Sequence, residues 1–274
     1  MWPMAAASRR SSRFVPAMAA LAGAAWLALW LWERSPYGRY LDHGDGGWLR
    51  SGPAGSLCAA LPAGEIVLPA VLYVGGWLLM LTAMMLPTTL PLLDIFRRLT
   101  SGRADQRVLM LLVIAGYLAA WALFAAAAHA LDGALLALAR RSAWLTFNGW
   151  FVGATILAVA GLYQFSALKY RCLDRCRSPL GFVIGHWRGS GHGARRKLQA
   201  FRLGAHHGAF CVGCCWSLML LMFVVGTGSV GWMLALGAAM AAEKNLPWGR
   251  RLAAPVGVAL LLAASWTVVS AAVA

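Results

Sequence analysis

The chain alternates between long apolar runs and short segments rich in arginine. A bilayer core about 30 Å thick requires about 20 apolar residues in a helix, and several runs reach or approach that length. We therefore predict an all-α fold, a polytopic integral membrane bundle of about seven transmembrane helices. The predicted spans are residues 14–32, 66–86, 108–131, 149–168, one that begins near residue 208, 230–242 and 252–273.

The same pattern divides the chain into three parts. Residues 1–33 combine a basic tail with the first transmembrane helix, and residues 34–65 form a polar, glycine-rich extracytoplasmic loop. Residues 66–274 form the main transmembrane helical domain, which holds the candidate metal ligands described below.

Composition and charge agree with a membrane protein. Of the 274 residues, 61% are hydrophobic and 12% are charged, and the formal net charge is +15. Because the arginines lie in short segments between spans, they indicate orientation in the lipid bilayer and not a nucleic-acid partner. With the N-terminus in the cytosol, 19 of the 24 Lys and Arg residues lie on the cytosolic side, which favours that topology.

Five of the six cysteines fall into two tight groups. Cys211, Cys214 and Cys215 open an apolar run, and Cys172 and Cys176 lie in a basic segment. If both segments are helical, the spacings of three and four residues place the thiols of each group on one helix face. This grouping favours reduced, metal-competent thiols over structural disulfides.

The predicted topology brings further soft ligands to the same membrane face. Met84 and Met85 lie at the cytosolic end of the second span, and Met219 lies one turn inside the cysteine triplet. His206 and His207 precede the triplet, and one of them is a candidate to complete a coordination sphere, for which we take His207. His186 lies in a segment rich in glycine and arginine, and we interpret it as solvated or facing phospholipid. Glu243 follows the sixth span, and we expect Lys244 to be its simplest ion-pair partner.

Ligand softness favours Cu(I), since thiolates and thioethers select this ion, whereas a closed set of four thiolates selects Zn(II). The sequence thus predicts a metal site with no catalytic residues. Its candidate ligands are Cys172, Cys176, Cys211, Cys214, Cys215, His207, Met84, Met85 and Met219.

Several of these motifs occur together in one known family. They are Trp77-x2-Met80-x3-Met84-Met85-Leu86-Pro87, Cys172-x3-Cys176-Arg177-Ser178-Pro179, Cys211-x-Gly213-Cys214-Cys215-Trp216 and Glu243-Lys244-x2-Pro247. In these motifs the chain resembles a bacterial family of predicted metal-binding integral membrane proteins, whose members are sometimes labelled copper chaperones. The resemblance implies a multi-pass protein of the bacterial cytoplasmic (inner) membrane that exchanges copper with a donor or acceptor protein.

Three functions remain open at this point. The protein handles Cu(I) at a cytosol-facing Cys/Met site, or it holds a structural Zn(II) ion, or it carries electrons as a thiol–disulfide pair. No nucleophile elbow, phosphate loop or zincin helix occurs in the sequence, so we predict that the protein is not an enzyme.

Overall fold

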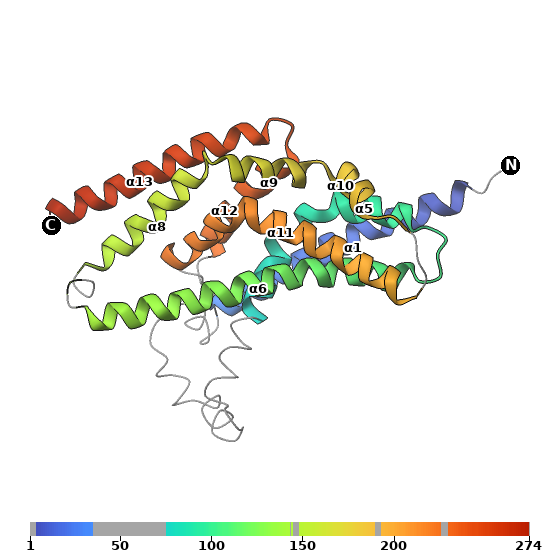
Figure 1. The fold of residues 1–274 in the computed structure, drawn as a ribbon, viewed down its shortest axis with the longest axis horizontal. Helices are drawn as coiled ribbons and strands as arrows, with labels where there is room; N and C mark the ends of the chain where they lie inside the picture. The colour runs from blue at the N-terminus through green and yellow to red at the C-terminus, as the bar shows by residue number, and fades with distance from the viewer. Residues whose placement is uncertain are drawn as a thin grey trace, which may run out of the picture. The chain divides into compact units, whose positions relative to one another are not determined.

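The structure is a computed structural model that describes residues 4–34, 75–142, 144, 148–189, 193–225 and 230–273. The described part is helical and contains no strand, as predicted. Contacts divide the chain into two compact units, residues 1–90 with 226–234 and residues 91–225 with 235–274. The helices are drawn in Figure 1 and are α1 (Met4–Arg34), η2 (Pro87–Thr89), α5 (Leu90–Leu99), α6 (Gln106–Arg141), α8 (Gly149–Tyr163), α9 (Ala167–Arg177), α10 (Pro179–His186), α11 (Ala194–Val225), α12 (Val230–Asn245), η3 (Gly249–Leu252) and α13 (Ala253–Val273).

Among the described residues, three helices are long and apolar enough to cross a membrane: Gln106–Leu135, Ala194–Met222 and Gly249–Val273. The number rises to five if each of two bent helix pairs counts as one span. The second of these pairs joins Gly149–Tyr163 to Ala167–Arg177 with a bend of 63°.

In the first unit, a helix over Gly75–Met84 ends just before Pro87, as the proline predicts. Pro87 has no N–H to donate to the Ala83 carbonyl, and the hydroxyls of two threonines support the turn that follows. The Thr88 hydroxyl donates to the Met85 carbonyl at 2.8 Å, and that of Thr89 donates to the Leu86 carbonyl at 2.7 Å. The Trp26 indole of α1 donates to the Ala83 carbonyl of the same unit at 3.1 Å.

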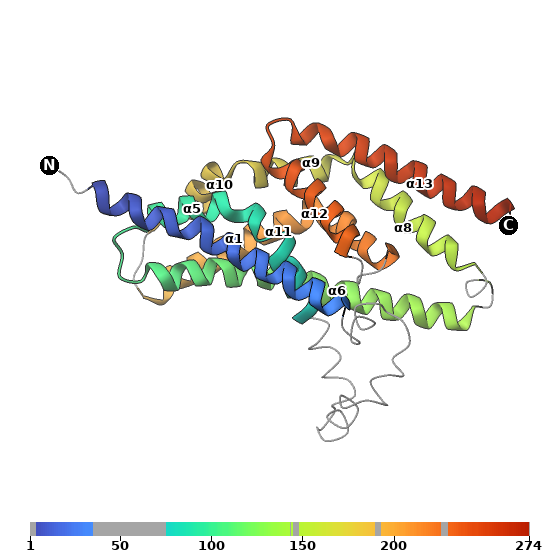
Figure 2. The same ribbon diagram turned by 180° about the vertical axis from the view of Figure 1, so that it is seen from behind.

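In the second unit, α11 packs most extensively against α6. Helix α13 packs along α8, as both views show (Figures 1 and 2). Glycines let the backbones of α6 and α11 touch. A Cβ on Gly204 would lie 1.9 Å from the Val113 carbonyl oxygen, and one on Gly116 would lie 2.1 Å from that of Phe201. Small residues at such contacts are typical of helix pairs in membranes.

We expect Gly204→Ala to lower stability by about 1–3 kcal/mol, because the new methyl group meets backbone that cannot turn aside. The matched control is Gly133→Ala on α6, where a Cβ meets nothing within 4 Å. Thermal unfolding of the purified protein in detergent measures both variants. A midpoint for Gly204→Ala equal to that of the control would contradict the close backbone packing.

Several predicted boundaries differ in the structure. The first helix begins at Met4 and not at residue 14, and α6 continues to Arg141 and not to residue 131. The fourth predicted span was continuous to residue 168, but α8 ends at Tyr163 and α9 begins at Ala167. The Ser166 hydroxyl caps α9 by accepting from the Lys169 backbone N–H at 3.1 Å. The helix that contains the fifth predicted span is α11, and it begins at Ala194 and not near residue 208. The end of the basic segment before the cysteine triplet therefore belongs to the same helix as the triplet.

Candidate metal centre

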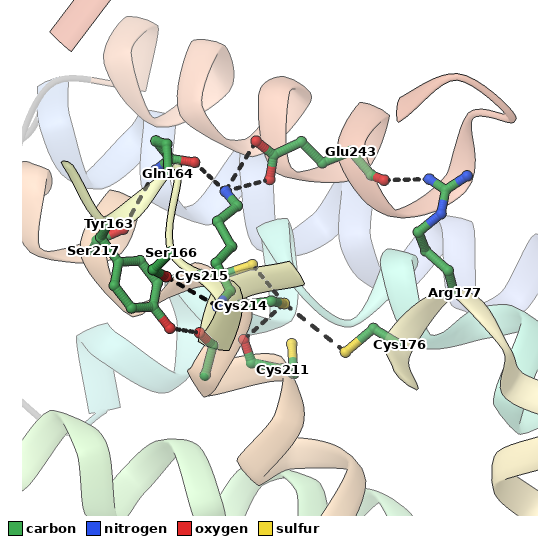
Figure 3. Close-up of polar contacts among 12 residues, drawn as sticks. Tyr163, Gln164, Ser166, Cys176, Arg177, Cys211, Cys214, Cys215, Ser217 and Glu243 are labelled. Atoms are coloured by element: carbon green, nitrogen blue, oxygen red, sulfur yellow. Dashed lines mark hydrogen bonds and ion pairs between the residues drawn. The ribbon is translucent and has the colours of Figure 1, made fainter. Parts of the chain in front are cut away.

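The five clustered cysteines lie on two neighbouring helices of the second unit, α9 and α11. The expected helix through the cysteine triplet is confirmed. Four sulfurs gather where the helices meet (Figure 3): Cys214 Sγ lies 3.3 Å from Cys215 Sγ and 3.9 Å from Cys176 Sγ. The Cys214 thiol also donates to the backbone carbonyl of Cys211 at 3.2 Å. Cys176 is half-buried, whereas the three thiols of α11 are buried, so the cluster is most accessible from α9.

The fifth thiol, Cys172, lies directly against the α11 backbone at Gly213. A Cβ on Gly213 would be 2.6 Å from Cys172 Sγ. The Tyr163 hydroxyl donates a hydrogen bond to the Gly213 carbonyl at the same level. Glycine at position 213 therefore provides the space that the Cys172 thiol occupies.

We expect Gly213→Ala to turn the Cys172 thiol away from α11. The clash involves the end of a short side chain, so stability should change little. If Cys172 binds the metal, the affinity for Cu(I) should fall about tenfold or more. Effects of this size are typical when a residue that orients a metal ligand is replaced. The matched control is Gly185→Ala on α10, which has open space. Wild-type affinity in Gly213→Ala, measured by competition with a Cu(I) chelator, would remove Cys172 from the ligand set.

Two polar groups contact the Cys211 sulfur. Lys244 Nζ, on α12, donates to Cys211 Sγ at 2.8 Å, and the Tyr117 hydroxyl of α6 lies 3.1 Å from the same sulfur. Cys211, Tyr117 and Lys244 are all buried. An ammonium group at this distance favours negative charge on the sulfur, as a soft cation site requires.

A second charged pair is fully buried beside the thiols. Lys169 Nζ of α9 lies 2.8 Å and 3.0 Å from the two carboxylate oxygens of Glu243, and it also donates to the side chain of Gln164 (Figure 3). The side chains of Lys169 and Glu243 are 0% and 1% exposed. The expectation that Lys244 would be the partner of Glu243 is thus corrected: the structure pairs Glu243 with Lys169, and Lys244 contacts a thiol.

Arg177 connects the end of α9 to the end of α12. Its guanidinium donates to the backbone carbonyl of Glu243 and, at 2.9 Å, to that of Pro247. Together with the buried ion pair, these bonds hold the charged end of α12 against the helix that carries Cys172 and Cys176.

The other candidate ligands are distributed as follows. Met219 is buried one turn beyond Cys215 on α11, and His207 is buried one turn before Cys211. Met84 and Met85 are also buried but belong to the first unit, so their role as ligands stays a prediction. Within the part of the chain that the structure describes, no group of three or more His, Cys, Asp or Glu side chains is arranged to hold a metal ion as it stands.

Sequence reasoning gave no site role to three residues that contact the cluster or its buried ion pair. Tyr117 lies in an apolar run with no motif around it, so nothing in the sequence signals its contact with Cys211. Gln164 and Lys169 had a signal, since both are polar residues within a predicted span or at its end.

Comparison with models of protein families shows which family the chain belongs to. A family model described as PpoB2, copper chaperone, matches residues 74–267, a range that includes both cysteine groups. The chain therefore belongs to this copper chaperone family. Comparison with curated proteins and with solved structures gives no match. Copper chaperones are a non-enzymatic class, which agrees with the prediction that the protein is not an enzyme, and the family description implies a copper donor or acceptor.

Proposed function

We propose that the protein binds Cu(I) as cargo at the thiol cluster of Cys176, Cys211, Cys214 and Cys215 and exchanges it with a partner protein. The observation that carries the proposal is the contact between this cluster and one buried ammonium, Lys244 Nζ at 2.8 Å from Cys211 Sγ. The family description supports copper as the metal.

The sulfur separations suit a shared ion. Two thiolates bound to one ion through bonds of about 2.3 Å lie about 3.8 Å apart in tetrahedral, about 4.0 Å apart in trigonal and about 4.6 Å apart in linear geometry. The observed separation of 3.9 Å matches the first two values, and the separation of 3.3 Å is shorter than all three. Small rotations of the cysteine side chains therefore suffice to direct two or three sulfurs at one ion.

The buried charge favours Cu(I) over Zn(II). A Cu(I) ion with two thiolates carries a net charge of −1, which the Lys244 ammonium compensates, whereas Zn(II) with four thiolates carries −2. The other buried cation of the site, Lys169, is already paired with Glu243. Since buried charge is costly unless it is compensated, the two-thiolate copper site is the better balanced of the two.

The membrane setting completes the proposal. Seven spans with the N-terminus in the cytosol would place both cysteine groups at the cytosolic face of the bacterial inner membrane, within reach of a soluble copper donor or acceptor. The support is the distribution of Lys and Arg along the sequence together with the long apolar helices. Met219 and Cys172 of the second unit would serve as auxiliary ligands.

Metal content and exchange test the proposal. The protein is purified in mild detergent under reducing conditions, its copper and zinc are quantified, and Cu(I) is titrated against a chromophoric chelator. We expect about one tightly bound and exchangeable Cu(I) per chain, from the two- to three-thiolate sites that this ion prefers. One firmly held zinc with no Cu(I) exchange would contradict copper handling and would indicate a structural zinc site.

A further inference from the structure

Two histidines outside the thiol cluster lie close together on neighbouring helices, with their ring planes nearly perpendicular. The rings of His186, at the end of α10, and His206, on α11, have centroids 5.5 Å apart and planes inclined at 76°. His206 is exposed and His186 is half-buried, so the pair is accessible from outside the protein. Neither residue is used by the cluster described above.

The separation of the two rings suits one bound ion. With metal–nitrogen bonds of about 2.0 Å, each ring centroid lies about 3.2 Å from the ion. Two imidazoles on one ion then have centroids about 5.2 Å apart at a tetrahedral angle and about 6.4 Å apart in a linear arrangement. The observed 5.5 Å lies between these limits.

His186 is already held in the form that binds metals. Its Nδ1 lies 2.9 Å from the carbonyl oxygen of Phe182. Because a carbonyl can only accept, Nδ1 carries the proton and Nε2 keeps its lone pair in the neutral ring. A hydrogen bond from the second ring nitrogen to a backbone carbonyl is the usual support of a metal-binding histidine.

A third histidine lies between this pair and the thiols. His207 follows His206 on α11 and precedes Cys211 by one turn, which places its side chain on the cysteine side of the helix. It is 4% exposed, and its Nδ1 has no hydrogen-bond partner. A buried ring nitrogen without a hydrogen-bond partner lowers the stability of the fold, and a metal ion that binds there offsets this cost.

Aromatic rings connect the three histidines and the cluster. The Phe182 ring contacts His186, with centroids 4.3 Å apart, and His207, with centroids 5.3 Å apart. Tyr117 stacks on His207 at 6.0 Å, and its hydroxyl contacts Cys211. His186, His207 and Cys211 therefore belong to one continuous packed group.

We propose that His186 and His206 form a copper uptake site, from which Cu(I) passes His207 to reach the thiols of α11. The proposal rests on the proposed function and adds the route to it. Copper stays in the +1 state throughout: each copper–nitrogen bond that breaks is replaced by a copper–sulfur bond, and any proton on the accepting thiol leaves to solvent. Imidazole binds Cu(I) less strongly than thiolate does, so transfer runs toward the cluster.

The rate of loading tests the route. Cu(I) is supplied as its complex with bicinchoninate, and its transfer to the detergent-solubilised protein is followed by the loss of chelator colour. We expect the double variant His186→Ala and His206→Ala to load about tenfold more slowly and to reach the wild-type endpoint, since the final ligands are intact. The matched control is His129→Ala, an exposed histidine of α6, which should load at the wild-type rate.

The outcomes separate the two proposals. If the wild-type protein loads and the double variant loads at the same rate, the uptake site is wrong while the thiol site stands. If the wild-type protein takes up no Cu(I), the proposed function fails and the route fails with it. A second readout uses the variant in which Cys172, Cys176, Cys211, Cys214 and Cys215 are all serine: it should retain a weaker Cu(I) site that is lost when His186 and His206 are also replaced by alanine.

Discussion

Replacing Cys214 and Cys215 together by serine is expected to lower the affinity for Cu(I) by more than about 100-fold. Loss of a residue that merely supports a metal ligand costs about 10–100-fold in affinity, and these two residues supply sulfur directly in our proposal. Cys214 is the centre of the cluster, since its sulfur lies within 4 Å of those of both Cys176 and Cys215. Serine keeps the size of the side chain but offers a hard oxygen, which Cu(I) binds poorly.

Competition with a Cu(I) chelator measures this loss under reducing conditions. The matched control is Cys58→Ser, which removes the one cysteine outside both groups and should leave the affinity unchanged. Tight binding at the wild-type level in the double variant would exclude the α11 thiols from the copper site, whatever the family description suggests.

The second large effect concerns the buried ion pair. We expect Lys169→Met to destabilise the protein by about 3–5 kcal/mol, because it leaves the Glu243 carboxylate buried without its cation. Adding Glu243→Gln should recover most of this loss, since the pair is then replaced by two uncharged side chains and no unpaired charge stays buried. Reversible unfolding in mixed micelles measures the three proteins.

An exposed ion pair provides the control for this prediction. Arg98 of α5 lies 2.7 Å from Asp94, and its side chain is 69% exposed. Arg98→Met should change the free energy of unfolding by no more than about 1 kcal/mol, as is typical of surface pairs. If Lys169→Met cost as little as Arg98→Met, the pair could not be buried as described.

The sequence predicted the helical class and the faces of the cysteine helices, because these depend on local patterns. Apolar runs of sufficient length predict helices, and spacings of three and four residues bring Cys211, Cys214 and Cys215 to one face. The spacing of Cys172 and Cys176 predicts the same for α9. Both segments are helical in the structure, and the sulfurs of Cys176 and Cys214 lie 3.9 Å apart.

Contacts between residues far apart in the chain could not be predicted from the sequence. Lys169 and Glu243 are 74 positions apart, and Lys244 and Cys211 are 33 apart, so no spacing rule relates them. The expected pair of neighbours, Glu243 with Lys244, was wrong because adjacent residues of a helix point in different directions and meet different helices. The pair of His186 and His206 was hidden for the same reason, since it depends on how α10 packs against α11.

The break between α8 and α9 had a different cause. Residues 149–168 are apolar almost throughout, so the pattern favours one continuous helix. In the structure α8 ends at Tyr163, Ser166 caps a new helix after a bend of 63°, and Lys169 of that helix contacts both Gln164 and Glu243. Recognising the cap would have required giving one serine more weight than a long apolar run.

X-ray absorption at the copper edge of the Cu(I)-loaded wild-type protein tests the central claim most directly. We predict a first shell of two or three sulfur atoms at roughly 2.2–2.3 Å, the bond length of metal thiolates, and a reduced sulfur contribution in the Cys214→Ser and Cys215→Ser double variant. A first shell made only of nitrogen and oxygen, unchanged in the double variant, would contradict a copper site built from the thiols of α9 and α11.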